Sequence, residues 1–189
     1  MKKLVLSALL AFSAMQLSGC VPVVATGVGA GIMMIDDRRT SATYLLDQEI
    51  EFKLAGEIRE KYGENTRVSF TSYNRRVMLT GQVPDEATRA AVEAIARAAQ
   101  NVRDVQNELS IGAVNSLMTR TGDTYTTARV KARFLDDKRF NANHVKVVTD
   151  ADTVYLMGLV RREEGDAAAE VAARTQGVRK VVKIFEYLD

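Results

Sequence analysis

The sequence predicts an α+β fold of two tandem domains, each with the order helix-strand-strand-helix-strand and a three-stranded mixed sheet covered by two helices. Two observations carry this prediction. Residues 77–83 read VMLTGQV and residues 154–160 read VYLMGLV, so one strand pattern occurs twice, 77 positions apart. Each copy also follows a short strand pattern at the same interval and precedes an Ala-rich segment and a Val-rich strand, which indicates an internal repeat. The shared glycine, Gly81 or Gly158, predicts close approach of a neighbouring element.

The first repeat shows all five elements. Apolar residues recur every four positions, as on the buried face of a helix, at Leu46, Ile50, Leu54 and Ile58. Gly63 suits the left-handed cap that ends such a helix. Strand patterns at 67–71 and 76–83 flank a four-residue turn and predict a hairpin. Acidic residues after Pro84 open a second helix, and a last strand is predicted over about 102–111.

The N-terminal segment has the pattern of a lipoprotein signal. Basic residues at positions 2 and 3 precede an uncharged, apolar stretch over 4–17, and Leu17-Ser18-Gly19-Cys20 resembles a bacterial lipobox. In such signals the cysteine is acylated and the chain is cut before it, which makes Cys20 the predicted lipid attachment site. The alternative is a retained transmembrane helix, since no charged residue occurs over 4–35. Pro22 and several glycines would interrupt that helix.

Five segments are predicted. Residues 112–122 contain Gly, Asn, Ser and Thr without periodicity, which is typical of a linker. The segments are a signal peptide (1–19), a lipidated N-terminus and flexible tether (20–43), the first domain (44–111), the linker (112–122) and the second domain (123–189).

The second sheet is predicted to be apolar on both faces. Such a sheet needs a cover, because it would otherwise expose a large apolar patch. We expect the first domain to provide the cover, since it is tethered, and homodimerisation through the same face is the alternative. The predicted interdomain contacts are Tyr73, Met78, Tyr155, Met157, Leu159, Val182 and Ile184.

The first helices of the two repeats differ in charge. Residues 44–62 carry three basic and five acidic residues, a net charge of −2, whereas 123–139 carry five basic and three acidic residues, a net of +2. Tyr125, Arg129 and Arg133 have four-residue spacing and share one face. An aromatic ring beside arginines suits a membrane interface, and an ordinary solvated basic face is the alternative.

The composition argues against several classes of function. Lys2 and Lys3 account for the whole net charge of +2, so the remaining chain has no basic excess for nucleic-acid binding. The single cysteine excludes an internal disulfide, and with one histidine in the chain no metal site is expected. That histidine, His144, has no partner nucleophile in the pattern. We therefore expect no catalytic residue, no enzyme activity and no cofactor.

The repeated unit with its Val-x-Leu-x-Gly-x-Val strand resembles the BON domain. A lipobox followed by two such units resembles the dual-BON outer-membrane lipoproteins, and GDTYTTARV at 122–130 and DRR at 37–39 also fit. The resemblance implies a non-enzymatic protein on the periplasmic face of the outer membrane that supports envelope integrity at division sites, and we expect it to be a monomer. It implies that the first helix of the second unit binds anionic phospholipid, either phosphatidylglycerol or cardiolipin.

Carried over by position, the resemblance assigns the lipid contact to particular residues of that helix. The predicted phospholipid-binding residues are Tyr125, Arg129, Lys131, Arg133 and Leu135, of which Arg133 comes from the charge pattern alone. Relatives have Trp where this chain has Tyr125, and Tyr buries less apolar area. The alternative function is an adaptor that binds an envelope-assembly protein, with lipid serving only as the anchor.

Overall fold

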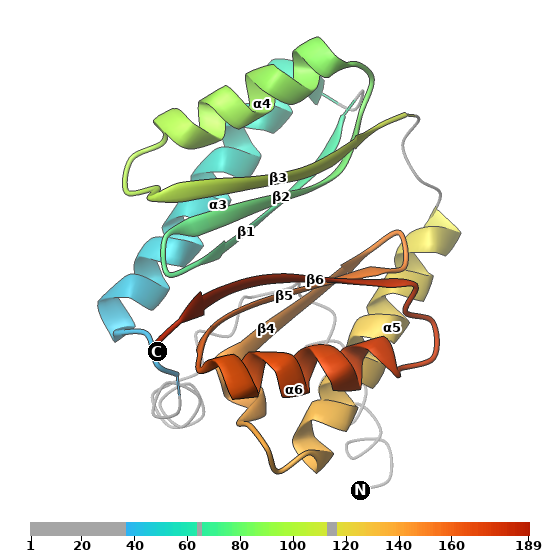
Figure 1. Ribbon diagram of the computed structural model, residues 1–189. Coiled ribbons are helices and arrows are strands. Elements are labelled where there is room, and N and C mark those ends of the chain that lie inside the picture. The colour runs from blue at the N-terminus through green and yellow to red at the C-terminus, as the bar shows by residue number, and fades with distance from the viewer. Residues whose placement is uncertain (1–36, 64–65, 113–116) are drawn as a thin grey trace, which may run out of the picture. The chain divides into compact units, whose positions relative to one another are not determined.

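Two helix-strand-strand-helix-strand units follow one another in the computed structural model, which describes residues 37–63, 66–112 and 117–189 (Figure 1). The first unit contains α3 (Ser41–Tyr62), β1 (Arg67–Tyr73), β2 (Arg76–Val83), α4 (Glu86–Ala98) and β3 (Asp104–Ile111). The second contains α5 (Leu117–Asp136), the 3-10 helix η3 (Ala142–His144), β4 (Val145–Asp150), β5 (Thr153–Val160), α6 (Arg162–Ala173) and β6 (Lys180–Tyr187). The described residues form one compact unit, and the predicted α+β fold is confirmed.

Each unit has one mixed sheet of three strands with the hairpin's second strand in the centre. In the first sheet, β1 pairs antiparallel with β2, and β3 pairs parallel with β2. The second sheet repeats this arrangement with β4, β5 and β6. The parallel pairing follows from the chain path, because the helix between the second and third strands returns the chain to the start of the sheet.

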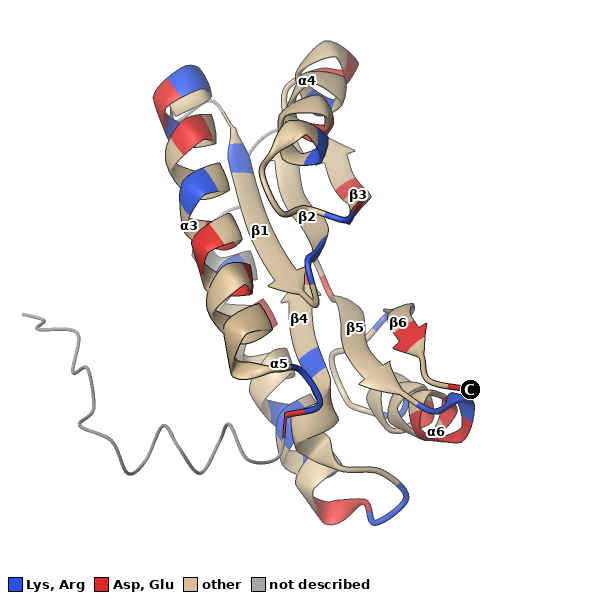
Figure 2. Ribbon diagram, turned by 90° about the vertical axis from the view of Figure 1, so that its left-hand side faces the viewer, with Lys and Arg blue, Asp and Glu red and all other residues tan. Residues whose placement is uncertain are grey.

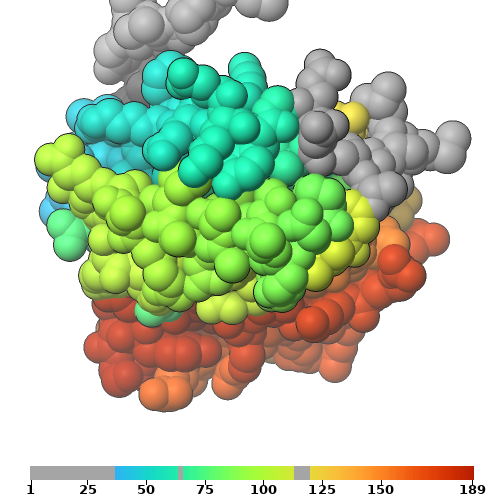
Figure 3. Space-filling model, turned by 90° about the horizontal axis from the view of Figure 1, so that it is seen from above, coloured from blue at the N-terminus to red at the C-terminus, as the bar shows by residue number. Residues whose placement is uncertain are grey.

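Two helices cover one face of each sheet and enclose a core. In the first unit α3 and α4 supply buried apolar residues that pack against the strands. Figure 3 shows the outer side of this unit, where the green atoms of α4 lie beside the blue-green atoms of α3. The buried residues of α3 are Asp47, Ile50, Leu54 and Ile58, so the four-residue stripe predicts the buried face correctly except at its first position. In the second unit, Val130 and Phe134 of α5 take the same role.

The repeated glycines are required by close backbone approach. A Cβ at Gly81 would lie 1.9 Å from the carbonyl oxygen of Arg67, and one at Gly158 would lie 2.3 Å from that of His144. Both distances are far below any tolerated contact, and Gly81 also has a φ of 119°. The prediction made from the strand pattern is confirmed.

The folded part starts earlier than predicted. Residues 37–43 were assigned to the flexible tether, but Thr40 caps α3 and accepts a hydrogen bond from the Thr43 backbone N–H at 3.1 Å. The preceding residues, Arg38 and Arg39, make ion pairs with folded parts of the chain. A short polar segment gives no periodic signal for such contacts, so the tether prediction is wrong for this stretch.

The predicted linker is also too long, because α5 begins at Leu117 rather than at Asp123. Gly122 lies inside the helix, at a cost of about 1 kcal/mol relative to Ala. The hydroxyl of Thr124 donates to the carbonyl of Arg120 at 3.0 Å, so the polar residues near this end are accommodated within helical geometry. Polar composition alone is therefore a poor guide to where this helix starts.

Two further findings concern the described residues only. None of their helices combines the length and the apolar character needed to cross a membrane. Within the same part of the chain, no group of three or more His, Cys, Asp or Glu side chains is placed to hold a metal ion.

Candidate functional site

The predicted lipid attachment site, Cys20, lies outside the described residues. The predicted lipid-binding residues lie on α5, whose orientation is fixed at both ends of its buried face. Near its start, the buried Asp123 accepts hydrogen bonds from the backbone N–H groups of Ala151 and Asp152, each at 3.1 Å. Further along, Val130 and Phe134 are fully buried in the core. These contacts leave the opposite side of α5 in solvent.

The five predicted lipid-binding residues lie on the solvent side and the flanks of α5. Tyr125 and Leu135 are 60% and 67% exposed, which is unusual for side chains of this size. Lys131 and Arg133 are exposed, and Arg129 is half-buried. The helix therefore presents two large apolar groups together with three cations.

Tyr125 and Arg129 form a pair. The Arg129 guanidinium lies 4.2 Å from the centroid of the Tyr125 ring and donates to its hydroxyl at 3.1 Å. It also donates to the side-chain oxygen of Gln176 at 3.2 Å, in the segment between α6 and β6. The cation–π contact keeps the positive charge beside the aromatic ring.

Arg133 points toward α6. Its guanidinium donates to the carbonyl oxygen of Arg174 at 2.5 Å and to the Thr175 hydroxyl at 3.4 Å. Arg174 follows the last residue of α6, where carbonyl groups lack intrahelical partners and favour a cation. Arg133 thus has a structural partner within its own domain, which four-residue spacing alone could not reveal.

Two exposed alanines complete the outward face of α5 and were missed by the sequence analysis. Tyr125, Ala128, Ala132 and Leu135 follow one another at intervals of three, four and three residues, so they form one continuous stripe. All four are exposed, and Arg129 and Lys131 lie on opposite sides of the stripe. The spacing could have identified the two alanines, but only the burial of Val130 and Phe134 shows that this stripe faces solvent.

The predicted interdomain residues gather into one apolar cluster between the two sheets. Its buried members are Tyr73, Met78, Tyr155, Met157, Leu159 and Ile184, with Val148 and Val182 packed against them. Val148 was not predicted. On the same face as Met78, the polar residues Thr80 and Gln82 are also buried.

Polar contacts surround this cluster. The Lys146 ammonium lies 2.8 Å from the Glu51 carboxylate of the first domain, and the Asn74 side-chain amide donates to Glu186 at 2.9 Å. Arg103 forms an ion pair with the same Glu186. These contacts join the two domains at the edges of the apolar cluster.

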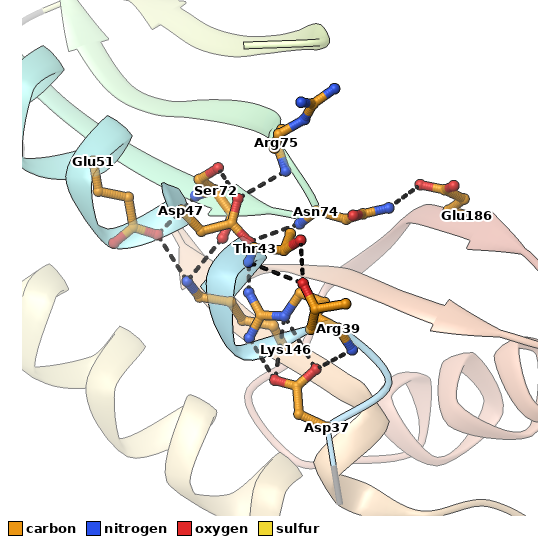
Figure 4. A network of polar contacts seen from close by, with 11 residues as sticks. Asp37, Arg39, Thr43, Asp47, Glu51, Ser72, Asn74, Arg75, Lys146 and Glu186 are labelled. Carbon is orange, nitrogen blue, oxygen red and sulfur yellow. Dashed lines mark hydrogen bonds and ion pairs between the residues drawn. The ribbon is translucent and has the colours of Figure 1, made fainter. Parts of the chain in front are cut away.

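Residues 37–39 bind both domains, as Figure 4 shows in part. Arg38 donates to both carboxylate oxygens of Glu164, at 2.6 and 2.8 Å, and to the Leu159 carbonyl at 2.9 Å. The hydrogen bonds from Arg38 lower the pKa of Glu164 to about 2. The next residue, Arg39, reaches the first domain instead, where it lies 2.8 Å from the Asp47 carboxylate and 3.9 Å from the Tyr73 ring centroid.

Arg39 is held in a buried polar site, with only 6% of its side chain exposed. Asp37 accepts from the Arg39 side chain and backbone. Burial would raise the pKa of Asp37, but these hydrogen bonds outweigh burial and lower it. Two carboxylates and an aromatic ring therefore compensate for the desolvation of one guanidinium.

Asp47 connects this site to the β1–β2 hairpin. Its carboxylate accepts from the Ser72 hydroxyl at 2.6 Å and from the backbone N–H groups of Asn74 and Arg75 at 2.8 and 2.7 Å. Asn74 and Arg75 both have positive φ, 52° and 63°, as a tight hairpin turn of type I′ requires. Asp123 makes the equivalent contacts in the second domain, so a helix aspartate that holds the hairpin turn is part of the repeat.

Comparisons with known proteins place this geometry in context. Residues 47–113 and 122–189 each match the family model of the BON domain. The chain is 35% identical over 175 residues to the outer membrane lipoprotein DolP of Haemophilus influenzae, covering 92% of this chain and 91% of that protein. It is 30% identical over 154 residues to the 21 kDa hemolysin of Actinobacillus pleuropneumoniae, covering 80% and 79%.

Two more distant similarities were found. The osmotically-inducible protein Y of Escherichia coli K12 is 30% identical over 121 residues, which cover 62% of this chain and 60% of that protein. A solved structure of CdsD, a structural protein of the type III secretion system of Chlamydia trachomatis, has a TM-score of 0.30 at 12% identity, with 76% of this chain and 92% of that chain covered. A similarity of that size carries no argument about this chain.

Proposed function

The chain belongs to the BON domain family, as an outer-membrane lipoprotein of the DolP and osmotically-inducible protein Y type, and from that premise we propose that it binds anionic phospholipid through α5. In this proposal it is anchored through Cys20 on the periplasmic face, acts without catalysis and supports envelope integrity at division sites. The bilayer that it binds contains phosphatidylglycerol or cardiolipin.

The exposed stripe of α5 is the observation that carries this proposal. Tyr125 and Leu135 lie at the two ends of the stripe and small alanines lie between them, so the helix can approach a bilayer closely along its whole outward face. Arg129 and Lys131 flank the stripe on opposite sides. A helix with an apolar stripe and basic flanks lies in the plane of a membrane interface, with its cations at the level of the phosphates.

Arg133 is left out of the proposed lipid surface. Its guanidinium is engaged with the carbonyl oxygen of Arg174 at the end of α6. Arg129 differs because its charge stacks on Tyr125, directly beside the stripe. The proposed surface therefore consists of Tyr125, Ala128, Arg129, Lys131, Ala132 and Leu135.

The charge contribution can be tested with unacylated protein that carries Cys20→Ser. We expect it to bind vesicles that contain phosphatidylglycerol and not purely zwitterionic vesicles. Each cation near an anionic surface contributes about 1 kcal/mol, so Arg129→Ala with Lys131→Ala should weaken binding about thirtyfold at low salt. Vesicle flotation over a range of lipid concentrations measures this loss.

The matched control is the double variant Arg59→Ala with Lys61→Ala in α3, which removes the same charge from exposed positions of the first domain. It should bind vesicles within about twofold of the unchanged protein. Equal losses for the two double variants would mean that only overall charge matters, and the assignment of the site to α5 would be wrong.

The apolar contribution should respond differently to salt. Tyr125→Glu should weaken vesicle binding about tenfold or more even at high salt, because it removes buried apolar area and adds a charge of the wrong sign. Tyr125→Trp should strengthen binding, since Trp is the larger interfacial anchor. If high salt restores normal binding of Tyr125→Glu, the ring does not enter the interface and this part of the proposal fails.

A further inference from the structure

The turn between α6 and β6 contacts Arg129, one of the two cations beside the exposed stripe of α5. This α6–β6 turn consists of residues 174–179. Its Gln176 accepts two hydrogen bonds from Nη1 of Arg129, one at the side-chain oxygen at 3.2 Å and one at the backbone carbonyl oxygen at 3.4 Å. Arg129 is thus connected to a residue that lies 47 positions further along the chain.

Close packing fixes where this turn lies relative to α5. Gly177 has a φ of 96°, and a Cβ there would lie 2.9 Å from the hydroxyl oxygen of the buried Thr126 on α5. Thr175 is also buried, and its hydroxyl donates to the Val171 carbonyl at 2.8 Å. Gln176 itself is exposed, but the residues before and after it are packed against the fold. Its acceptor groups therefore have a defined place beside α5.

The contacts of Arg129 determine where its charge lies and which of its donors remain. Nη1 donates to Gln176, and Nη2 donates to the Tyr125 hydroxyl while the guanidinium lies on the Tyr125 ring. Nε has no hydrogen-bond acceptor in the part of the chain that the structure describes. The Nε–H and the second Nη2–H form one edge of the guanidinium, and such an edge binds two oxygens of one phosphate group.

Lys131, the other cation beside the stripe, is not held in this way. Four basic residues lie along α5 (blue in Figure 2), and among the described contacts the exposed Lys131 makes neither an ion pair nor a hydrogen bond. An ammonium on a flexible stem acts as a point charge, whereas a planar guanidinium presents two donors in a fixed direction. We therefore expect Lys131 to respond to the charge of a bilayer and Arg129 to the shape of the group it binds.

We propose that Gln176 is a positioning residue, which holds Arg129 on Tyr125 so that the free edge of the guanidinium binds the phosphodiester of a phospholipid. This inference rests on the proposed function, and it adds a recognised chemical group and a residue outside α5. The preference for anionic bilayers then comes from total charge, because zwitterionic phospholipids contain the same phosphodiester. Ordering a long side chain before the lipid arrives removes part of the entropic cost of binding.

NMR of the Arg129 side chain without lipid tests the positioning itself. Rotation about the Nε–Cζ bond should be about threefold faster in Gln176→Ala than in the unchanged protein, because the stronger of the two hydrogen bonds is lost. The matched control is Gln100→Ala, the same change at an exposed residue of the first domain, which should leave this rotation unchanged. Equal rotation rates in Gln176→Ala and the unchanged protein would overturn the proposal.

Flotation of unacylated protein with phosphatidylglycerol vesicles tests whether the positioning matters for lipid. Gln176→Ala should weaken binding about threefold, although it leaves the net charge unchanged. In protein that already carries Arg129→Ala, the same substitution should have no further effect, because Gln176 acts through Arg129 alone. Gln100→Ala should bind like the unchanged protein. Equal losses from Gln176→Ala with and without Arg129 would show an indirect effect on the fold and would contradict the proposal.

A second substitution tests the shape of the bound group. Arg129→Lys keeps the charge and removes the two-donor edge, so it should weaken vesicle binding about fivefold. The matched control is Arg133→Lys, the same change one helical turn further along, at a residue left out of the proposed lipid surface. It should change binding by less than about twofold. Equal binding of Arg129→Lys and the unchanged protein would rule out recognition of the phosphodiester by this edge.

Soluble phosphate distinguishes a lipid headgroup from a free anion. Sodium phosphate should displace the protein from vesicles no more than sodium chloride of equal ionic strength, because it lacks the apolar part that covers Tyr125 and Leu135. Stronger displacement would assign the edge to a soluble phosphate and overturn the lipid assignment. If NMR shows Arg129 held but no vesicle binds, the proposed function fails and the lipid part of this inference with it. Vesicle binding that Gln176→Ala leaves unchanged overturns this inference alone.

Discussion

Replacing Met157 by Asp should destabilise the protein by about 4 kcal/mol or more. Met157 is 1% exposed and belongs to the apolar cluster between the two sheets. The substitution removes a large buried side chain and leaves a carboxylate among Met78, Leu159 and Ile184, where neither water nor a cation compensates for its desolvation. Urea unfolding followed by circular dichroism measures the change in the free energy of unfolding.

Two companion variants separate burial from the chemistry of the change. Met157→Leu conserves volume and should cost less than about 1.5 kcal/mol. Leu135→Asp makes the same chemical change at a 67% exposed position and should alter the free energy of unfolding by about 0.5 kcal/mol at most. Comparable losses for Met157→Asp and Leu135→Asp would contradict the packing of the two sheets against each other.

Removing the Asp47 carboxylate should have an effect of similar size, about 3 to 5 kcal/mol. Asp47→Ala leaves the Arg39 guanidinium with one carboxylate fewer in a buried site, and it removes the acceptor of the Asn74 and Arg75 backbone N–H groups. Breaking a buried pair from one side is costly because the remaining charge stays desolvated. Thermal and urea unfolding of the variant provide the measurement.

The second domain supplies the control for this prediction. Asp123→Ala removes the acceptor of two hairpin N–H groups, Ala151 and Asp152, without disturbing Arg39, and should cost about 1 to 3 kcal/mol. The difference between the two variants isolates the ion pair with Arg39. If Asp123→Ala destabilises the protein as much as Asp47→Ala, the buried ion pair contributes nothing.

Local periodicity explains why much of the fold could be predicted. The stripe of α3 repeats every four residues and matches its buried side chains except at Leu46. The strand patterns around Gly81 and Gly158 identify the central strands, in which side chains of both faces are buried. The interdomain cluster could be predicted because the outer face of the second sheet is apolar and such a face must be covered. For α5, the change of net charge between equivalent helices singled out the element on which the structure places the exposed stripe of Tyr125, Ala128, Ala132 and Leu135.

Contacts between distant polar residues could not be predicted in this way. Arg38 lies 126 positions from Glu164, and nothing in a short polar segment indicates its partner. The same holds for Arg133, whose spacing from Tyr125 suggested a shared ligand although its guanidinium contacts the end of α6. Local sequence predicts which face a residue occupies, whereas the partners of a long polar side chain depend on how whole elements pack.

The neighbouring residues Arg38 and Arg39 determine how a mechanical load enters the folded part of the chain. A pull on the backbone before Asp37 reaches Glu164 of the second domain through Arg38 and Asp47 of the first domain through Arg39. The two domains are then loaded in parallel. If the chain joined the fold at α3 alone, they would be loaded in series and the pull would tend to peel one sheet from the other. Tension that enters before Asp37 therefore reaches the first domain through the backbone and the Arg39–Asp47 ion pair, and the second domain through the Arg38–Glu164 ion pair.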